Sequence, residues 1–202
     1  MADTRNADLT FGATDYLVYA APINTEMPAD FADPASPWLN CGWITTDGGL
    51  FKIEEESKDV EAAGSLEPIR TLMTKSVKSL QVTFLEGLNP FVRALYDNVP
   101  IASLEPTTGA VTYSLPDKPD DLRYSFVFDS VDGDKRMRLY MPNGKVVERG
   151  DEQPQTTDVM NVQMTFKFFK GAANSPAVTR SLDYADIDVS GFFAAGGEVP
   201  SP

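Results

Sequence analysis

The sequence predicts a mainly β fold: an antiparallel β-sandwich or barrel with one short flanking α-helix and long loops. Three observations predict it. Apolar and polar residues alternate in several short runs, turn residues separate these runs, and one segment alone has the four-residue spacing of an amphipathic helix. The chain has 202 residues, of which 42% are hydrophobic. A chain of this size buries about 70% of the surface of its unfolded form, so it can build a real core.

The first part of the chain predicts a strand, a loop and a hairpin. Residues 15–20 form a run rich in β-forming residues, and the proline-rich stretch 26–37 predicts a loop. Residues 43–46 and 50–54 then flank a turn whose positive φ angles would match the twist of two paired strands. The residues of this predicted hairpin turn are Asp47, Gly48 and Gly49.

The middle of the chain predicts a long loop and the one helix. Residues 56–75 begin acidic, continue with small residues and contain Pro68, so we expect a loop there. Residues 78–84 alternate as a half-buried strand does. The helix is predicted over 89–98, because Asn89 can cap its free amides and Pro90 fits its first turn.

The last part of the chain returns to β structure. Residues 122–147 predict a meander with turns at 132–133 and 142–144, and residues 160–168 form the clearest strand of the sequence. A final strand is expected within 181–189. The domain organisation that follows is an N-terminal arm over 1–14, a β-sandwich domain over 15–190 and a flexible C-terminal tail over 191–202.

The absence of histidine removes most enzyme classes. Ser-His-Asp and Cys-His catalysis and most zinc sites need this residue, and Cys41, the single cysteine, has no histidine to generate its thiolate. Asp129, Asp132 and Asp134 surround Gly133, but their spacing is not that of a calcium loop, so a polar hairpin turn is the better interpretation. We therefore expect no catalytic residues, no cofactor and no metal.

Two other functions stay open at this point. Trp38 and Trp43 could stack on a sugar, as in carbohydrate-binding sandwiches, although tryptophans beside a turn serve equally well as packing anchors. A glycosidase would use a pair of neighbouring carboxylates, and with 30 acidic residues a sequence cannot single out one pair.

The charge balance disfavours nucleic acid as a ligand. There are 17 basic and 30 acidic residues, a net charge of −13, so a DNA-binding face would have to form against the average field. Residues 1–11 lack the basic and then apolar pattern of a signal peptide, and no apolar run approaches 18 residues. We expect synthesis in the cytoplasm and no membrane anchor.

One stretch of the chain resembles a known family. It runs from Asn40 to Leu50, continues with the acidic 54–56 and the small-residue 62–64, and closes with 68–71 and 82–86. These segments are similar to the hairpin, acidic strand, loop ending in arginine and following strand of the major tail (tail tube) proteins of long-tailed bacteriophages. The resemblance is good over 41–98 and is limited to a strand pattern over 120–170.

The resemblance implies a structural virion protein of the phage tail. Six copies would close a ring by pairing sheet edges, and stacked rings would form a tube through which DNA passes without specific binding. Its partners would be further copies of itself and the tail terminator, tape measure and baseplate proteins. Tubes of contractile tails or secretion systems share these features, so they stay alternatives.

The resemblance also suggests which residues make contacts between copies. Candidates for ring stacking are the N-terminal arm, the C-terminal tail and the predicted loop 56–75. The loop residues proposed for this inter-subunit contact are Glu56, Lys58, Asp59, Glu61, Glu67 and Arg70. Since a bore of the same sign as DNA would repel phosphates, we expect acids to outnumber bases on bore-facing strand positions.

Overall fold

The structure is a computed structural model that describes residues 6–64, 66–104 and 109–189. Its strands form one antiparallel sheet in the order β2-β1-β5-β6-β7-β4-β3, and β8 also pairs with β6. The strands are β1 Asp15–Pro22, β2 Leu39–Asn40, β3 Ile44–Val60, β4 Arg70–Phe84, β5 Tyr124–Asp132, β6 Lys135–Arg149, β7 Val162–Phe168 and β8 Thr179–Asp183. The helices are α1 Pro90–Asp97 and the 3-10 turns η1 Ala7–Leu9, η2 Ile101–Ser103 and η3 Ala172–Asn174.

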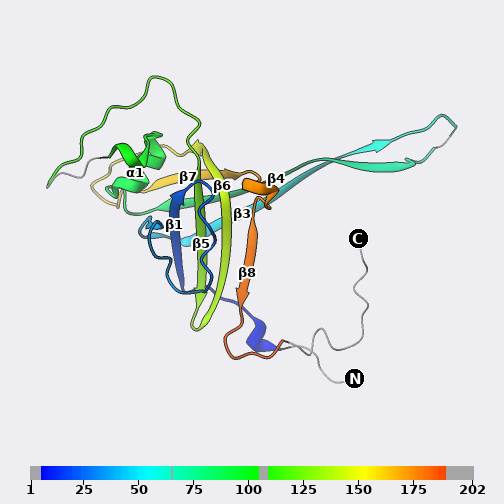
Figure 1. Ribbon diagram of the computed structural model, residues 1–202, viewed down its shortest axis with the longest axis horizontal. Helices are drawn as coiled ribbons and strands as arrows, with labels where there is room; N and C mark the ends of the chain where they lie inside the picture. The colour runs from blue at the N-terminus through cyan, green and yellow to red at the C-terminus, as the bar shows by residue number, and fades with distance from the viewer. Residues whose placement is uncertain (1–5, 65, 105–108, 190–202) are drawn as a thin grey trace.

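Strand β6 belongs to two layers. Its first half pairs with β5 and β8, whereas its second half, from Gly144 on, pairs with β7. The sheet therefore folds over into a layer containing β1, β5 and β8 and a layer containing β7, β4 and β3, whose strands run across each other (Figure 1). This confirms the predicted mainly β, sandwich-like fold, which is not closed into a barrel.

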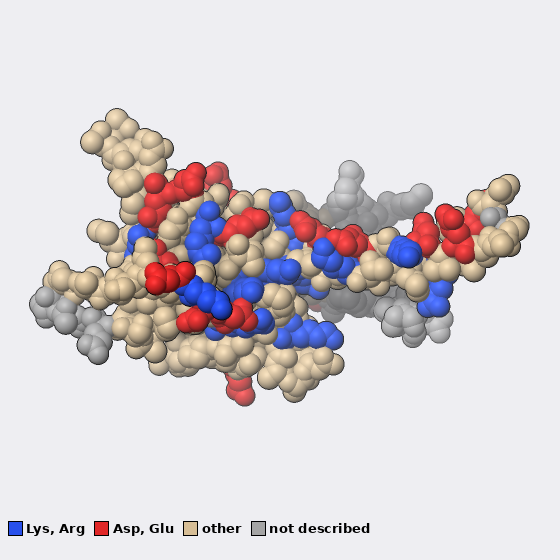
Figure 2. Space-filling model, turned by 90° about the horizontal axis from the view of Figure 1, so that it is seen from above, with Lys and Arg blue, Asp and Glu red and all other residues tan. Residues whose placement is uncertain are grey.

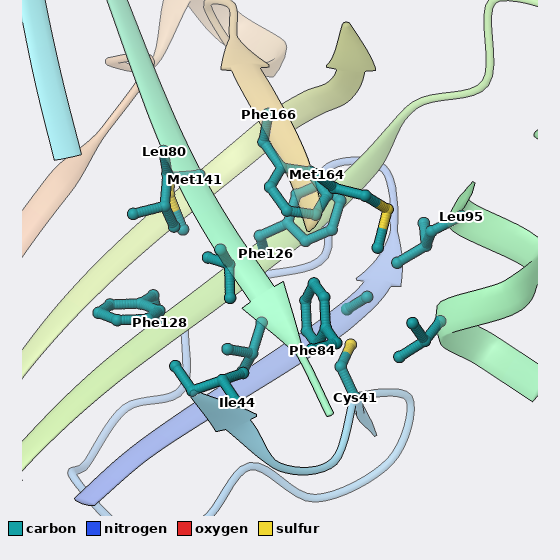
Figure 3. Packing of buried hydrophobic residues seen from close by; sticks show 14 of the residues in the cluster. Cys41, Ile44, Leu80, Phe84, Leu95, Phe126, Phe128, Met141, Met164 and Phe166 are labelled. Carbon is teal, nitrogen blue, oxygen red and sulfur yellow. The ribbon is translucent and has the colours of Figure 1, made fainter. Parts of the chain in front are cut away.

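The core lies between the two layers. On β7 the buried residues alternate with polar ones, and the same period of two places Leu80, Val82 and Phe84 of β4 on the inner face. The rings of Phe126 and Phe166 have centroids 4.7 Å apart, and Phe84 packs edge-on against Phe166 (Figure 3). The strands predicted over 78–84 and 160–168 are confirmed, with β4 extending further back to Arg70.

The predicted turn at 142–144 is wrong, because β6 continues through it. A shift of register opposite β5 absorbs the additional residue, so Pro142 and Asn143 lie in a bulge. A Cβ atom on Gly144 would lie 2.8 Å from Cδ1 of Phe168 and 2.9 Å from Cδ2 of Phe126. Glycine is needed here for close approach of the two rings.

Gly144→Ala is therefore expected to destabilise the fold. Overpacking a core of this kind typically costs about 1–3 kcal/mol, and for a chain of this length each kcal/mol lowers the melting temperature by about 2–4 °C. Thermal unfolding followed by circular dichroism measures the effect. The control is Gly12→Ala, where a Cβ atom has no neighbour within 4 Å. Equal melting temperatures for the two variants would contradict the packing role of Gly144.

Helix α1 closes one end of the sandwich and confirms the helix predicted over 89–98. The side chain of Asn89 accepts a hydrogen bond from the amide of Phe91, Pro90 occupies the first turn, and Asn98 ends the helix in the left-handed conformation. Val92 and Leu95 are buried in the core cluster. The amphipathic spacing read from the sequence thus corresponds to a helix packed on one face.

The predicted hairpin turn at Asp47, Gly48 and Gly49 is wrong. These residues lie inside β3, where the register shifts between the pairs Ile44–Phe84 and Gly49–Val82. Gly48 has a φ of 70°, as expected for a turn glycine, but a Cβ atom there would lie 2.6 Å from the ring of Tyr16. The glycines form a bulge that admits aromatic side chains from the opposite layer.

The predicted long loop over 56–75 is also wrong. Strands β3 and β4 stay paired from Glu54–Val77 out to Val60–Arg70, and a connection of residues 61–69 joins them. This two-stranded part, here called the hairpin extension, projects from the body of the molecule (Figure 1). Because solvent surrounds both of its faces, its sequence lacks the apolar alternation that marks a half-buried strand.

Loop 23–38 covers the second face of the β1-β5-β6 layer. Arg138 and Asp129 are buried, and the guanidinium donates hydrogen bonds to both carboxylate oxygens, at 2.8 Å from Nε and 2.6 Å from Nη2. Arg138 also donates to the carbonyls of Asp30 and Ala32. The loop is therefore tied to the sheet through its backbone, and Asp129 has a structural partner.

The two ends of the domain differ from expectation in detail. In the predicted N-terminal arm, the amide of Gly12 donates to Asp132 and that of Thr14 to the carbonyl of Val131, so this part lies along the β5–β6 turn. The final strand is β8, which begins and ends earlier than predicted over 181–189. Residues 1–5 of the arm and 190–202, including the predicted flexible tail, lie outside the described residues.

Candidate functional site

The outer face of the second layer, here called the polar face, is formed by the outward residues of β3, β4, β7 and the second half of β6. Alternation places polar side chains there because the inward positions fill the core. The face contains a shallow hollow of about 370 Å³. Its lining residues are Leu50, Lys52, Glu54, Val77, Ser79, Gln81, Val147, Glu148, Thr165 and Lys167.

Charges of both signs occupy the polar face. Lys145 and Lys167 stand directly opposite each other on β6 and β7, a like-charge pair that is unfavourable by itself. The ring of Phe169 lies 5.8 Å from each of their ammonium groups, and Lys145 also pairs with Asp121 at 2.9 Å. Hydrogen bonds from Lys145 and Arg123 lower the pKa of the Asp121 carboxyl. These contacts hold both lysines at the surface.

The second layer has two open edges. In the described part of the chain, β3 pairs with β4 alone, and residues 145–149 of β6 pair with β7 alone. Backbone donors and acceptors on the outer sides of these strands are therefore available to another chain. The edge of β3 carries three consecutive acids, Glu54 to Glu56, and the edge of β6 carries the bases Lys145 and Arg149 and the acid Glu148.

The six candidate contact residues all lie on the hairpin extension. Glu56 pairs with Lys75, which raises the pKa of the lysine, and Asp59 accepts a hydrogen bond from Thr71 at 2.6 Å. Lys58 stands opposite Leu72, and Arg70 opposite Val60. Glu61 and Glu67 lie in the connection. The structure thus brings the six onto one element, and acidic and basic side chains lie close together along it (Figure 2).

The tip of the hairpin extension is apolar, which the sequence analysis missed. Its outer part exposes three large apolar side chains, Leu66 and Ile69 in the connection and Met73 on β4 opposite Ser57, which are together called the apolar tip. In the sequence they are spaced three and four residues apart, as on one face of a helix, but Pro68 lies among them and argues against a helix, so the pattern does not reveal a strand hairpin. Residues 70–77 contain strand-favouring Thr71, Thr74 and Val77, but the acidic run 54–59 that pairs with them does not favour a strand, so no local signal predicts this hairpin.

A second exposed apolar surface lies beside α1 and was also missed. Residues 85–91 and 159–160 line a groove of about 790 Å³, here called the apolar groove. Leu88 and Val159 are exposed at it, and Trp43 is exposed close by in a hollow that shares Glu86 and Asn89 with the groove. The carboxylate of Glu86 accepts hydrogen bonds from the Trp43 amide at 3.0 Å and from Asn89 at 3.1 Å.

Other candidate chemistry finds no support at these positions. Trp38 is buried against Tyr140, with ring centroids 6.3 Å apart, so it cannot stack on a sugar, and of the two tryptophans only Trp43 is exposed. Burial raises the pKa of the Cys41 thiol to about 12. No group of three or more metal-ligating side chains is gathered within the described ranges. None of the helices in the described part of the chain has the length and apolar character needed to span a bilayer.

Comparison with known proteins decides the family. Residues 3–184 match the sequence profile of a family described as phage tail tube protein. The chain belongs to this family. A chain in the cryo-EM structure of the anti-feeding prophage (AFP) baseplate, 6-fold symmetrised, superposes on this tail tube protein with a TM-score of 0.41 and 10% sequence identity, over 86% of this chain and 97% of that chain. No curated protein matches the chain.

Family membership gives the surfaces described above a context. The tail tube protein is a structural component of a phage tail. In such a protein the open edges, the hairpin extension and the apolar groove are candidate contacts between subunits, and the polar face is a candidate lining. Paired strands form the open edges, the hairpin extension and the polar face. The apolar groove is formed mainly by the connection from β4 into α1.

Proposed function

We propose that this tail tube protein assembles into six-membered rings that stack into a hollow tube for genome delivery, with the virion tail as its location. The observation that carries the proposal is the second layer, which has four strands, a polar outer face and two open edges. Pairing the edges of successive copies would satisfy their backbone groups, and ring closure would leave no free edge. The proposal needs no active site and no cofactor.

Strand directions support this closure. From β6 through β7 and β4 to β3 each step is antiparallel, so β3 runs opposite to β6. Rotation about a tube axis preserves direction, and β3 of one copy would therefore meet β6 of the next as an antiparallel pair. Six copies of four strands give 24 strands, and with ~4.8 Å spacing and ~40° tilt the circle is about 48 Å across. Duplex DNA fits inside.

Charge supports the same edge pairing. The edge of β3 offers Glu54 to Glu56, and the edge of β6 offers two bases, Lys145 and Arg149, against one acid, Glu148. Opposite charges on neighbouring strands favour pairing, and like charges on identical edges disfavour contacts between two β3 edges. The complementarity thus selects the contact that closes a ring.

The polar face is the proposed lining of the bore, and its charge differs from expectation. Its strand positions hold Lys52, Lys145 and Lys167 against Glu54 and Glu148. Acids therefore do not outnumber bases at these positions. The net charge of −13 is a sum over the whole chain, and many of the acids lie on the hairpin extension and in loops. Close spacing of both signs would still leave no continuous positive track to hold phosphates.

Stacking of rings requires a second contact. The hairpin extension, with its six candidate residues, is the proposed element, together with the N-terminal arm and the C-terminal tail. Other copies of this chain are the main partners, and tail terminator, tape measure and baseplate proteins are the proposed partners at the tube ends and inside it. DNA is proposed to pass without specific binding.

Electron microscopy of a charge-reversed edge tests the proposal. The wild-type protein, concentrated and negatively stained, is expected to show rings or hollow rods. Glu54→Lys with Glu55→Lys places positive charge on both edges and is expected to reduce ring formation at least tenfold at equal concentration. The control, Asp117→Lys with Asp134→Lys, makes the same change of charge at exposed positions away from the edges. Wild-type protein that stays monomeric at every concentration would overturn the proposal.

A further inference from the structure

We infer that the apolar tip of the hairpin extension of one copy docks into the apolar groove beside α1 of another copy. This inference deepens the proposed function and rests on it, because both require contacts between copies of the chain. It names the two surfaces of one contact, which edge pairing does not involve.

The tip has the exposure of a surface that is covered in an assembly. Leu66 is 106% exposed, Ile69 63% and Met73 66%. Two-stranded hairpins without a further packing partner are marginally stable in water, and this one extends past the core for seven residues of β3, from Glu54 to Val60. A partner that covers the tip would remove apolar surface from water and hold the strands together.

The groove has the matching character. Its lining is mainly apolar, and Leu88 at 91% and Val159 at 63% exposure stand at its rim. Gly87 lets the side chain of Met160 pack closely against the backbone in this lining, since a Cβ atom there would lie 2.6 Å from Cε of Met160. Trp43, 73% exposed, extends the apolar surface on the side of Glu86. Large exposed aromatic residues of this kind are typical anchors of protein interfaces.

The distribution of exposed apolar residues singles out these two places. Among the described residues, the seven most exposed large hydrophobic side chains are Leu66, Leu88, Trp43, Met73, Leu115, Ile69 and Val159. Three belong to the tip and three to the groove and its margin. Two separate apolar surfaces of the same chain are thus exposed to solvent, and contact between them would bury both.

The occupant of the groove must come from another copy. Strand β4 runs without interruption from Arg70, next to the tip, to Phe84, next to the groove. At ~3.3 Å per residue it separates the two by about 45 Å. The hairpin extension and α1 also lie at opposite ends of the long axis in Figure 1. A tip therefore cannot reach the groove of its own chain.

Chemical cross-linking tests the contact. In the variant Leu66→Cys with Val159→Cys, a short bismaleimide is expected to join successive copies, so that a denaturing gel shows a ladder of dimers, trimers and larger species. Cys41 does not interfere, because it is fully buried. Each single variant is expected to stop at dimers. The matched control is Leu66→Cys with Leu115→Cys, which uses an equally exposed position outside the groove.

The outcomes separate this inference from the proposed function. A ladder from the first pair, at least tenfold stronger than from the control pair, supports the contact. Rings or tubes in the microscope together with no ladder, or with equal ladders from both pairs, overturn the inference and leave the tube function standing. A chain that forms neither rings nor ladders overturns both. A ladder without rings or tubes supports the contact and contradicts the tube.

Discussion

Removal of the hairpin extension is expected to abolish tube formation while the protein stays folded. Residues 57–74 are replaced by Asn-Gly, so that Glu56 and Lys75, which are paired across the two strands, flank a two-residue turn. The core contacts of β3 and β4 begin beyond this point, at residues 78–84 and their partners. Sedimentation velocity measures assembly, and thermal unfolding measures the fold.

The control for this variant is Ser57→Ala, which changes an exposed residue of the hairpin extension outside the six candidate contact residues and leaves the apolar tip intact. It is expected to form tubes as the wild type does. Normal tubes from the shortened chain would show that the hairpin extension has no part in assembly. Loss of the folded state in the shortened chain would show that the extension stabilises the monomer, contrary to the separation of core and extension described here.

Asp129→Ala is expected to give the largest loss of stability among single substitutions considered. It leaves the Arg138 guanidinium buried without its carboxylate, and removing one partner of a buried ion pair costs about 3–5 kcal/mol. The Arg138 guanidinium would then lose the carboxylate that orients it for its two hydrogen bonds to loop 23–38. Chemical denaturation measures the free energy of unfolding, and the melting temperature is expected to fall by roughly 6–20 °C.

Two further variants separate the ion pair from simple packing. Asp129→Leu with Arg138→Met replaces both charges by apolar side chains and is expected to recover only part of the loss, because no unpaired charge stays buried but the carbonyls of Asp30 and Ala32 lose their donor. Lys75→Ala, which breaks the exposed pair with Glu56, is expected to leave the unfolding free energy nearly unchanged. If Asp129→Ala is as stable as Lys75→Ala, the buried pair does not hold the loop.

The sequence predicts those elements that are buried on one face. Strand β7, the last part of β4 over 78–84 and helix α1 alternate or repeat because the core selects every second or every third to fourth residue, and their positions follow directly. The turn at Asp132 and Gly133 was also predictable, because Asp-Gly is typical of a two-residue turn between paired strands. Asp132 pairs with Lys135 next to this turn. Three residues further from the turn on each strand, Asp129 pairs with Arg138, so the buried ion pair could have been predicted from the sequence.

The elements that the sequence could not predict depend on contacts between distant segments. Gly48 and Gly144 have the sequence context of turn residues, yet both lie within strands. Glycine is needed at these positions because aromatic rings from other strands occupy the space that a side chain would fill. The hairpin extension has no core behind it, and so no alternation. The groove depends on residues 85–91 meeting 159–160, a proximity that no local pattern records.

The position of the hairpin extension and α1 at opposite extremities of the molecule has a consequence for the finished particle. A head-to-tail contact that does not close into a ring never saturates itself, since each added copy leaves one unlike surface free. The polymer would be directional, with projecting strands at one terminus and vacant hollows at the other. Growth could then be stopped at each terminus by a different protein, and the length would have to be set by something other than the subunit.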